Sequence, residues 1–250
     1  MRASPTLKHA TGQPPMARAC LGVLMLDTRF PRLPGDVGCA QSFAVPALLH
    51  RVRGAHAARV VTSAQSLRES GLAQHFVAAA QALVAQGATA LTTSCGFLVL
   101  LQRELQAAVP VPLASSSLLQ LPDLLAREPR VGVLTISAAQ LGDEHLRSAG
   151  VPESRLPDVL VQGVDPEGEF ARCILEDREQ MDVTRVGEEL VDAALALRAR
   201  APELRSVVLE CTNMPPHAAA IHRATGFELR WLAHAPALRG MFAPGENRAA

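Results

Sequence analysis

Short apolar runs alternate with longer segments of helical periodicity along most of this chain. Four short runs are largely apolar, and the first is continuously so, as is typical of parallel strands buried on both faces. They lie at residues 20–26, 88–91, 130–136 and 206–209. Apolar residues recur at helical spacing over 66–86 and over 181–200, and Gly87 ends the first of these helices. Strands that alternate with helices predict the α/β class with mainly parallel sheets.

Weaker patterns complete the alternation. Short strands or extended segments are expected at 59–62, 109–113 and 158–161, and the segment 44–52 is ambiguous. Further helices are expected at 97–105, 118–127, 138–149 and 218–223.

One of the buried strands ends at a cysteine. Thr92-Thr-Ser leads into Cys95, and the apolar segment after Gly96 predicts a helix. Ligands bind at this carboxyl edge in open α/β sheets. A helix N-terminus also lowers the pKa of a thiol and attracts an anion. For a single cysteine, an inert buried thiol is the favoured alternative.

The same pattern recurs near the other end of the chain. The strand 206–209 runs through Glu210 into Cys211, and Pro215 and Pro216 suit the first turn of the helix that follows. Two cysteines in the same local context favour a catalytic role for the pair over two inert thiols.

The chain also contains an internal duplication. Residues 21–27 and 131–136 carry similar strand sequences, and each precedes its cysteine by a similar interval. We therefore expect two similar α/β domains related by a pseudo-two-fold, with the active site in the cleft between them. The expected parts are a disordered tail at 1–17, a first domain at 18–112 plus 218–250 that carries Cys95, and a second domain at 113–217 that carries Cys211.

A long loop rich in proline and glycine, 27–38, follows the first strand. Long loops on this edge are often functional, so we expect this one to cover the cleft. Asp27 would then lie near a cysteine, and Arg29 or backbone N–H groups would meet a carboxylate. In the alternative interpretation Asp27 only caps a helix.

Composition narrows the chemistry. The 250 residues are 48% hydrophobic and carry formal net charge +0, which argues against nucleic-acid partners. Five cysteines without framework spacing favour a reducing compartment, and no apolar run is long enough to span a membrane. We expect a cytoplasmic protein. Tyrosine is absent and Lys8 is the only lysine, which excludes a lysine Schiff base or a tyrosine base. No cofactor or metal is expected.

Two thiols on opposite sides of a carbon acid suit stereochemical inversion. One thiolate removes the proton, and the other thiol delivers a proton to the opposite face. The carbanion needs preorganised donors, which the strand-end loops can supply. Substrate contacts are expected from Asp27, Thr28, Arg29, Thr93, Ser94, Gly96, Ser115, Ser116, Ser117, Thr135, Thr212 and Asn213. We interpret Cys20, Cys39 and Cys173 as structural.

These motifs resemble the cofactor-independent aspartate/glutamate racemase superfamily. The resemblance covers nearly everything after Arg18, and its motifs lie at 22–31, 92–97, 115–117, 131–135 and 210–216. It implies Cys95 and Cys211 as the acid/base pair. Gly96-Phe97 and Asn213 depart from the glutamate racemase pattern, so glutamate is not the expected substrate.

We accordingly predict an isomerase, namely a racemase or epimerase of a small carboxylate such as an amino acid or a derivative. A homodimer is expected as the assembly. The alternatives are a decarboxylase or a cis-trans isomerase on the same scaffold, or a non-catalytic ligand-binding member. The fold alone does not decide among these reactions.

Overall fold

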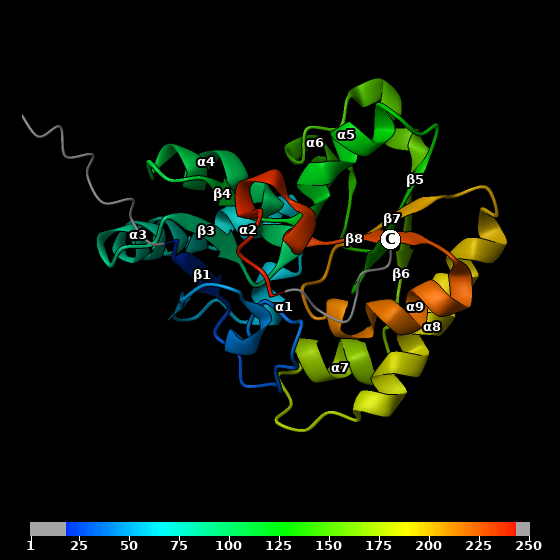
Figure 1. Ribbon diagram of the computed structural model, residues 1–250, viewed down its shortest axis with the longest axis horizontal. Coiled ribbons are helices and arrows are strands. Elements are labelled where there is room, and N and C mark those ends of the chain that lie inside the picture. The colour runs from blue at the N-terminus through cyan, green and yellow to red at the C-terminus, as the bar shows by residue number, and fades with distance from the viewer. Residues whose placement is uncertain (1–18, 244–250) are drawn as a thin grey trace, which may run out of the picture.

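The computed structural model describes residues 19–243 and shows two four-stranded sheets, one in each half of the molecule (Figure 1). The first sheet has the order β2 (Ala47–Arg51), β1 (Leu21–Met25), β3 (Ala90–Thr93) and β4 (Leu113–Ala114). The second has the order β6 (Val159–Gly163), β5 (Val131–Thr135), β7 (Ser206–Leu209) and β8 (Glu228–Arg230). All neighbouring strands pair in parallel. The predicted α/β class with two similar parallel halves is confirmed.

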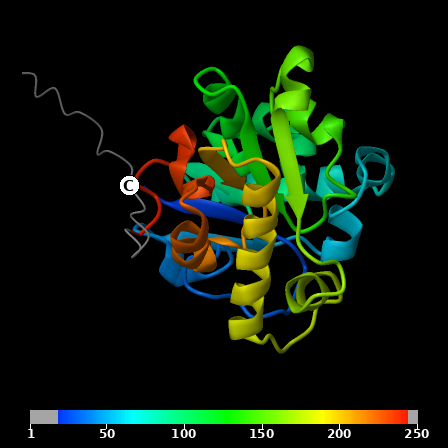
Figure 2. The same cartoon turned by 90° about the vertical axis from the view of Figure 1, so that its right-hand side faces the viewer.

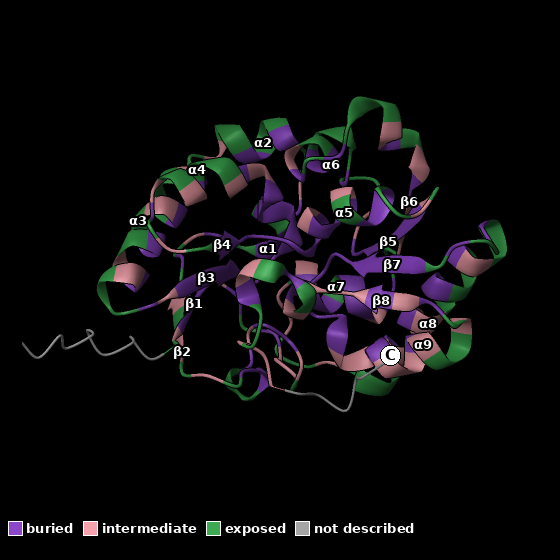
Figure 3. Cartoon of the chain, turned by 45° about the horizontal axis from the view of Figure 1, so that its top comes forward, coloured by how far each residue is buried: buried purple, intermediate pink, exposed green. Residues whose placement is uncertain are grey.

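Helices cover the sheets, and the inner strands β1, β3, β5 and β7 are buried between them (Figure 3). The α-helices of the described residues are α1 (Ala57–Val60), α2 (Ala64–Glu69), α3 (Leu72–Ala85), α4 (Gln102–Ala107), α5 (Leu121–Leu125), α6 (Asp143–Ser148), α7 (Glu169–Leu175), α8 (Val183–Arg200) and α9 (Ala218–Thr225). The long helix α8 is the yellow helix at the front of Figure 2, and it packs on α7 and α9.

Two local predictions were wrong. The expected strand at 59–62 is largely the helical turn α1, because β2 already occupies that edge of the first sheet and Val60 packs into the core from the turn. The expected helix 66–86 is divided into α2 and α3. Gly71 at the break has φ +70°, a conformation that glycine adopts without strain.

The internal duplication is visible in the packing of two glycines. Gly22 and Gly132 are each the second residue of the first strand of their sheet. A Cβ atom on Gly22 would lie 2.4 Å from Leu91 Cδ2, and one on Gly132 would lie 2.9 Å from Leu197 Cδ2. In both halves, the absence of a side chain on the glycine lets a leucine side chain pack directly against the strand backbone.

The sheets divide the chain at different points from the predicted domain boundaries. Strand β4 belongs to the first sheet, and β8 belongs to the second. The 3-10 helix η7 (Pro236–Leu238) then returns to contact β3 and β4, and Phe242 bridges to Phe43. The cause is pairing: β4 completes one sheet by bonding to β3, and β8 completes the other by bonding to β7. The tail predicted at 1–17 lies outside the described residues.

One apolar core runs through both halves and includes Cys95 and Cys211. A smaller cluster beneath η7 covers the opposite face of β1 and β3. Within residues 19–243, no helix is long and apolar enough to cross a membrane.

Candidate active site

Cys95 lies at the junction between β3 and the 3-10 helix η2 (Gly96–Leu101). Its backbone is extended, with φ −153°, and the residue is 7% exposed. The backbone N–H groups of Phe97 and Leu98 donate to its sulfur. The Thr93 hydroxyl accepts from the Cys95 N–H at 3.3 Å and donates to the Ser115 carbonyl at 2.7 Å. The Cys95 thiol is thus held in place by the end of β3, by the first turn of η2 and by the loop that contains Ser115.

Cys211 occupies the equivalent junction after β7 and is also 7% exposed. Its thiol donates to Asn213 Oδ1 at 3.5 Å. The Thr212 hydroxyl donates to the Ser94 carbonyl at 2.8 Å, which ties the two strand ends together across the halves. Both cysteines are free, and they lie close enough for Cys95 to raise the pKa of Cys211. The structure therefore brings the two predicted cysteines into one buried site.

A carboxyl group that the sequence analysis did not select lies beside both thiols. Glu210 is 1% exposed, and its Oε2 accepts from the Thr135 hydroxyl at 2.8 Å. The Ile136 N–H also donates to this carboxylate, whereas Oε1 has no hydrogen-bond partner among the described residues. Burial raises the pKa of Glu210 to about 7. Its charge in turn raises the pKa of both cysteines, on top of the larger effect of their burial.

Because Gly96 has no side chain, the Glu210 carboxyl group can pack directly against its backbone. A Cβ atom at position 96 would lie 2.4 Å from both the Glu210 carbonyl oxygen and Glu210 Oε1. Any side chain there would separate the ends of β3 and β7. The departure from the glutamate racemase pattern at this position therefore has a structural cause in Glu210.

The long loop places an ion pair at the site. Arg32 bonds Asp36 at 3.2 Å and Thr28 at 2.9 Å, and its guanidinium lies 4.0 Å from the centre of the Phe30 ring. Asp36 is buried and accepts from the Asn213 side-chain amide. The positive charge of Arg32 lowers the pKa of Cys95, and Asp36 raises that of Cys211. Sequence reasoning missed this pair, although its i, i+4 spacing within a suspected functional loop was a usable signal.

Two of the predicted loop residues bond other groups of the protein. Asp27 accepts from the Gly54 N–H at 2.9 Å. The Arg29 side chain is 64% exposed. Its guanidinium forms ion pairs with Asp177 at 3.4 Å and Glu179 at 2.9 Å, both in the second half of the molecule. The positive charge that acts on Cys95 comes from Arg32.

The predicted hydroxyls mostly hold the backbone. Ser94 Oγ accepts from the Leu26 N–H at 2.9 Å, Ser116 accepts from the Leu118 N–H, and Ser117 donates to the Leu209 carbonyl at 2.6 Å. Ser115 Oγ is buried and has no hydrogen-bond partner among the described residues.

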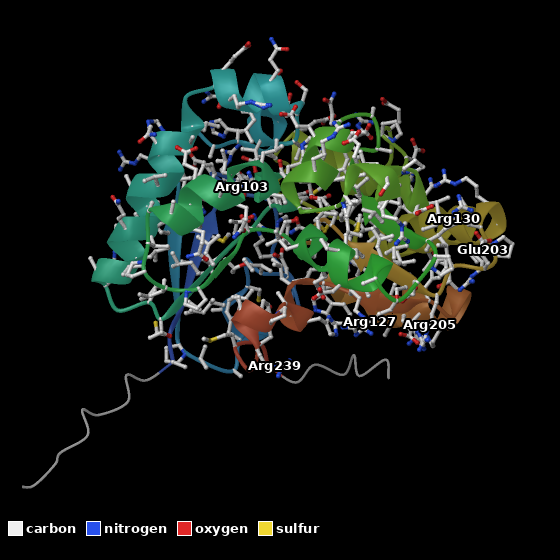
Figure 4. All side chains as sticks on the ribbon, turned by 90° about the horizontal axis from the view of Figure 1, so that it is seen from above. Arg103, Arg127, Arg130, Glu203, Arg205 and Arg239 are labelled. Atoms are coloured by element: carbon white, nitrogen blue, oxygen red, sulfur yellow. The ribbon has the colours of Figure 1, made fainter. Side chains whose placement is uncertain are left out.

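Other candidate features lie outside this site. A cavity of about 530 Å³ is lined by Leu33, α8 and the segment of Pro216 and His217, and none of the cysteines lines it. Arg127, Arg130 and Arg205 project at the other edge of the second sheet, before β5 and β7 begin, and Arg130 pairs with Glu203 at 2.8 Å (Figure 4). Among residues 19–243, no group of His, Cys, Asp and Glu side chains is arranged to hold a metal ion.

Replacement of Glu210 by glutamine is expected to make stability less dependent on pH. A carboxyl whose pKa rises from 4.5 to about 7 on folding stabilises the fold fully below pH 4.5, and this contribution is lost as the pH rises through 7. Glu210→Gln should therefore gain about 3 kcal/mol relative to wild type between pH 4.5 and pH 8. Urea unfolding at both pH values measures the difference. A constant difference would show that Glu210 titrates normally.

Comparison with solved structures confirms the racemase-like fold. Unliganded arylmalonate decarboxylase superposes with a TM-score of 0.52 at 14% identity, over 84% of this chain and 86% of that one. Glutamate racemase from Bacillus anthracis gives 0.50 at 14% identity, over 85% and 76% of the two chains. No family model matches the sequence.

The sequence relatives point to a different reaction class. A dimethylsulfoniopropionate lyase from Durusdinium sp. clade D is 30% identical over 229 residues, which covers 89% of this chain and 71% of that protein. Dimethylsulfoniopropionate lyase 5 of Emiliania huxleyi is 29% identical over 221 residues, 83% of this chain and 42% of that one. The predicted racemase or epimerase activity, and with it the isomerase class, is therefore wrong: the resemblance identified a scaffold that several chemistries share. The chain belongs to the dimethylsulfoniopropionate lyase family.

Proposed function

We propose that this protein is a lyase that cleaves dimethylsulfoniopropionate by β-elimination. The observation that carries the proposal is the 30% identity to such a lyase over 89% of the chain. The paired buried cysteines support it, since they offer a base suited to a carbon acid. Of the alternatives considered above, the decarboxylase is itself a lyase, so it shares its reaction class with these relatives.

The elimination needs one base. The base removes a proton from the carbon beside the carboxylate, and the electron pair of that C–H bond forms the double bond of acrylate. The bond between the β-carbon and sulfur breaks, and its electron pair leaves with dimethyl sulfide. The leaving group is neutral, so it needs no proton from the enzyme. The same thiol that would serve one face in racemisation is thus sufficient here.

The surroundings favour Cys95 as this base. Its sulfur accepts two backbone N–H groups and feels the charge of Arg32, and all three effects stabilise a thiolate. The Cys211 sulfur accepts one backbone N–H, that of Asn213, and faces the negative charge of Asp36, while its thiol hydrogen is donated to Asn213 Oδ1. Cys95 therefore takes the proton, and Cys211 stays a thiol beside it.

The charges of the site complement those of the substrate. Arg32 is 14% exposed at its side chain and can meet the substrate carboxylate, which also stabilises the negative charge that develops on the α-carbon. Asp36 supplies negative charge for the sulfonium group. Each end of the zwitterionic substrate thus has an oppositely charged partner, with Arg32 for the carboxylate and Asp36 for the sulfonium group.

Dimethyl sulfide release tests the proposal directly. Purified protein is incubated with dimethylsulfoniopropionate, and headspace gas chromatography measures dimethyl sulfide while proton NMR measures acrylate. The two products should form in equal amounts. The double variant Cys95→Ser/Cys211→Ser is the control. Release no faster than with this variant would refute the lyase assignment.

A further inference from the structure

Glu210 is a buried acid that the elimination as written does not use. It follows the last residue of β7, directly precedes Cys211 and packs on the backbone of Gly96, the neighbour of Cys95. Its carboxyl group therefore lies between the two cysteine-bearing turns. One oxygen is satisfied by Thr135, and the other has no partner among the described residues.

Few positively charged side chains lie near the two cysteines and Glu210. Glu210 acts on both cysteines, Arg32 acts on Cys95, and Asp36 acts on Cys211. Arg32 is the one cation among these groups, and it is already paired with Asp36. Like charges that share a buried site cannot all ionise, because their repulsion is poorly screened there. A charged Glu210 and a thiolate therefore exclude one another.

We propose that Glu210 is a positioning residue that controls when a thiolate can form. While its carboxylate is charged, both cysteines are held as thiols, and neutralisation of the carboxylate allows one sulfur to ionise. The catalytic consequence rests on the proposed lyase function, whereas the charge state of the sulfurs can be measured without substrate. The unpartnered oxygen supports this role, since a carboxylate that served only the fold would have both oxygens bonded.

Thiolate titration tests the proposal. Absorbance at 240 nm follows thiolate formation with pH, and mass spectrometry after iodoacetamide treatment reports the alkylation of Cys95 and Cys211 separately from the other cysteines. Glu210→Gln keeps the shape and removes the charge. We expect the midpoint to fall by at least one pH unit, which corresponds to about tenfold faster alkylation at a fixed pH below it. Glu210→Asp keeps the charge and should keep the wild-type midpoint more closely.

Two further variants make the result decisive. Glu128→Gln is the matched control, because Glu128 bonds Ser206 at the opposite end of the same strand, and this variant should leave the midpoint unchanged. Thr135→Val removes a donor to the carboxylate and should shift the midpoint in the same direction as Glu210→Gln, by less. This variant decides the question if Glu210→Gln does not fold.

The outcomes separate the two proposals. An unchanged midpoint in Glu210→Gln, or in Thr135→Val if only that variant folds, overturns the role of Glu210 even if the protein releases dimethyl sulfide. A lowered midpoint supports the role even if no dimethyl sulfide is released. In an active lyase, the rising limb of the pH profile of kcat/KM should move to lower pH with the thiolate titration. A loss of thermal stability without that movement would indicate a structural residue only.

Discussion

Cys95→Ser is expected to lower the turnover of dimethylsulfoniopropionate by about 10²–10⁴-fold, the usual contribution of a general base. Serine nearly matches the shape of cysteine, but its hydroxyl is far less acidic, so the base is lost while the turn is kept. Dimethyl sulfide release under single-turnover conditions measures the effect. Substrate binding should persist, because the charged groups that would hold the zwitterion remain in place.

Cys211→Ser provides the contrast. Its thiol already acts as a hydrogen-bond donor to Asn213, a role that a serine hydroxyl can also fill. We expect a loss of about tenfold or less, as for one hydrogen bond of ordinary strength. Equal and large losses in both variants would indicate that both sulfurs take part in proton transfer. A reversed order would assign the base to Cys211.

Arg32→Met is expected to be the most damaging change outside the cysteines. It leaves Asp36 buried without its cation, and breaking a buried pair from one side costs about 3–5 kcal/mol. It also removes the cation proposed for the substrate carboxylate, so kcat/KM should fall by about 10²–10³-fold. Chemical denaturation and steady-state kinetics measure the two effects separately.

The same loop contains the matched control. Arg29 pairs with Asp177 and Glu179 at the surface, where such pairs contribute about 1 kcal/mol or less. Arg29→Met should therefore leave both stability and activity close to wild type. In Arg32→Met/Asp36→Asn, stability should recover, because no buried charge is left unpaired, while activity stays low. Recovered activity in the double variant would contradict a substrate-binding role for Arg32.

Much of the fold follows from local patterns. Largely apolar runs predicted β1, β3, β5 and β7, because strands that are covered on both faces contain few polar side chains. Edge strands were harder to predict. β8 is three residues long with alternating burial, too short for a pattern, and its place in the second sheet depends on pairing with β7.

The site shows the same division. Cys95 and Cys211 could be selected because each follows an apolar strand with small hydroxyl residues or a proline turn beside it. Glu210 was visible next to Cys211, yet nothing local indicates that its carboxyl group is buried against Gly96 of the other half. Arg29 and Arg32 look alike in sequence, and only the folded loop turns one outward and the other inward.

The sequence by itself determined the strand-and-helix alternation, the duplication and the two strand-end cysteines. These features depend on side-chain polarity and on spacing within a few residues, and such local patterns can be recognised without knowledge of the tertiary structure. Tertiary structure alone decided which distant charges meet the thiols, since Arg32 and Glu210 act on Cys95, and Asp36 acts on Cys211, across contacts between segments far apart in the chain. Burial then gives those charges their strength, because a dry site screens them far less than water does.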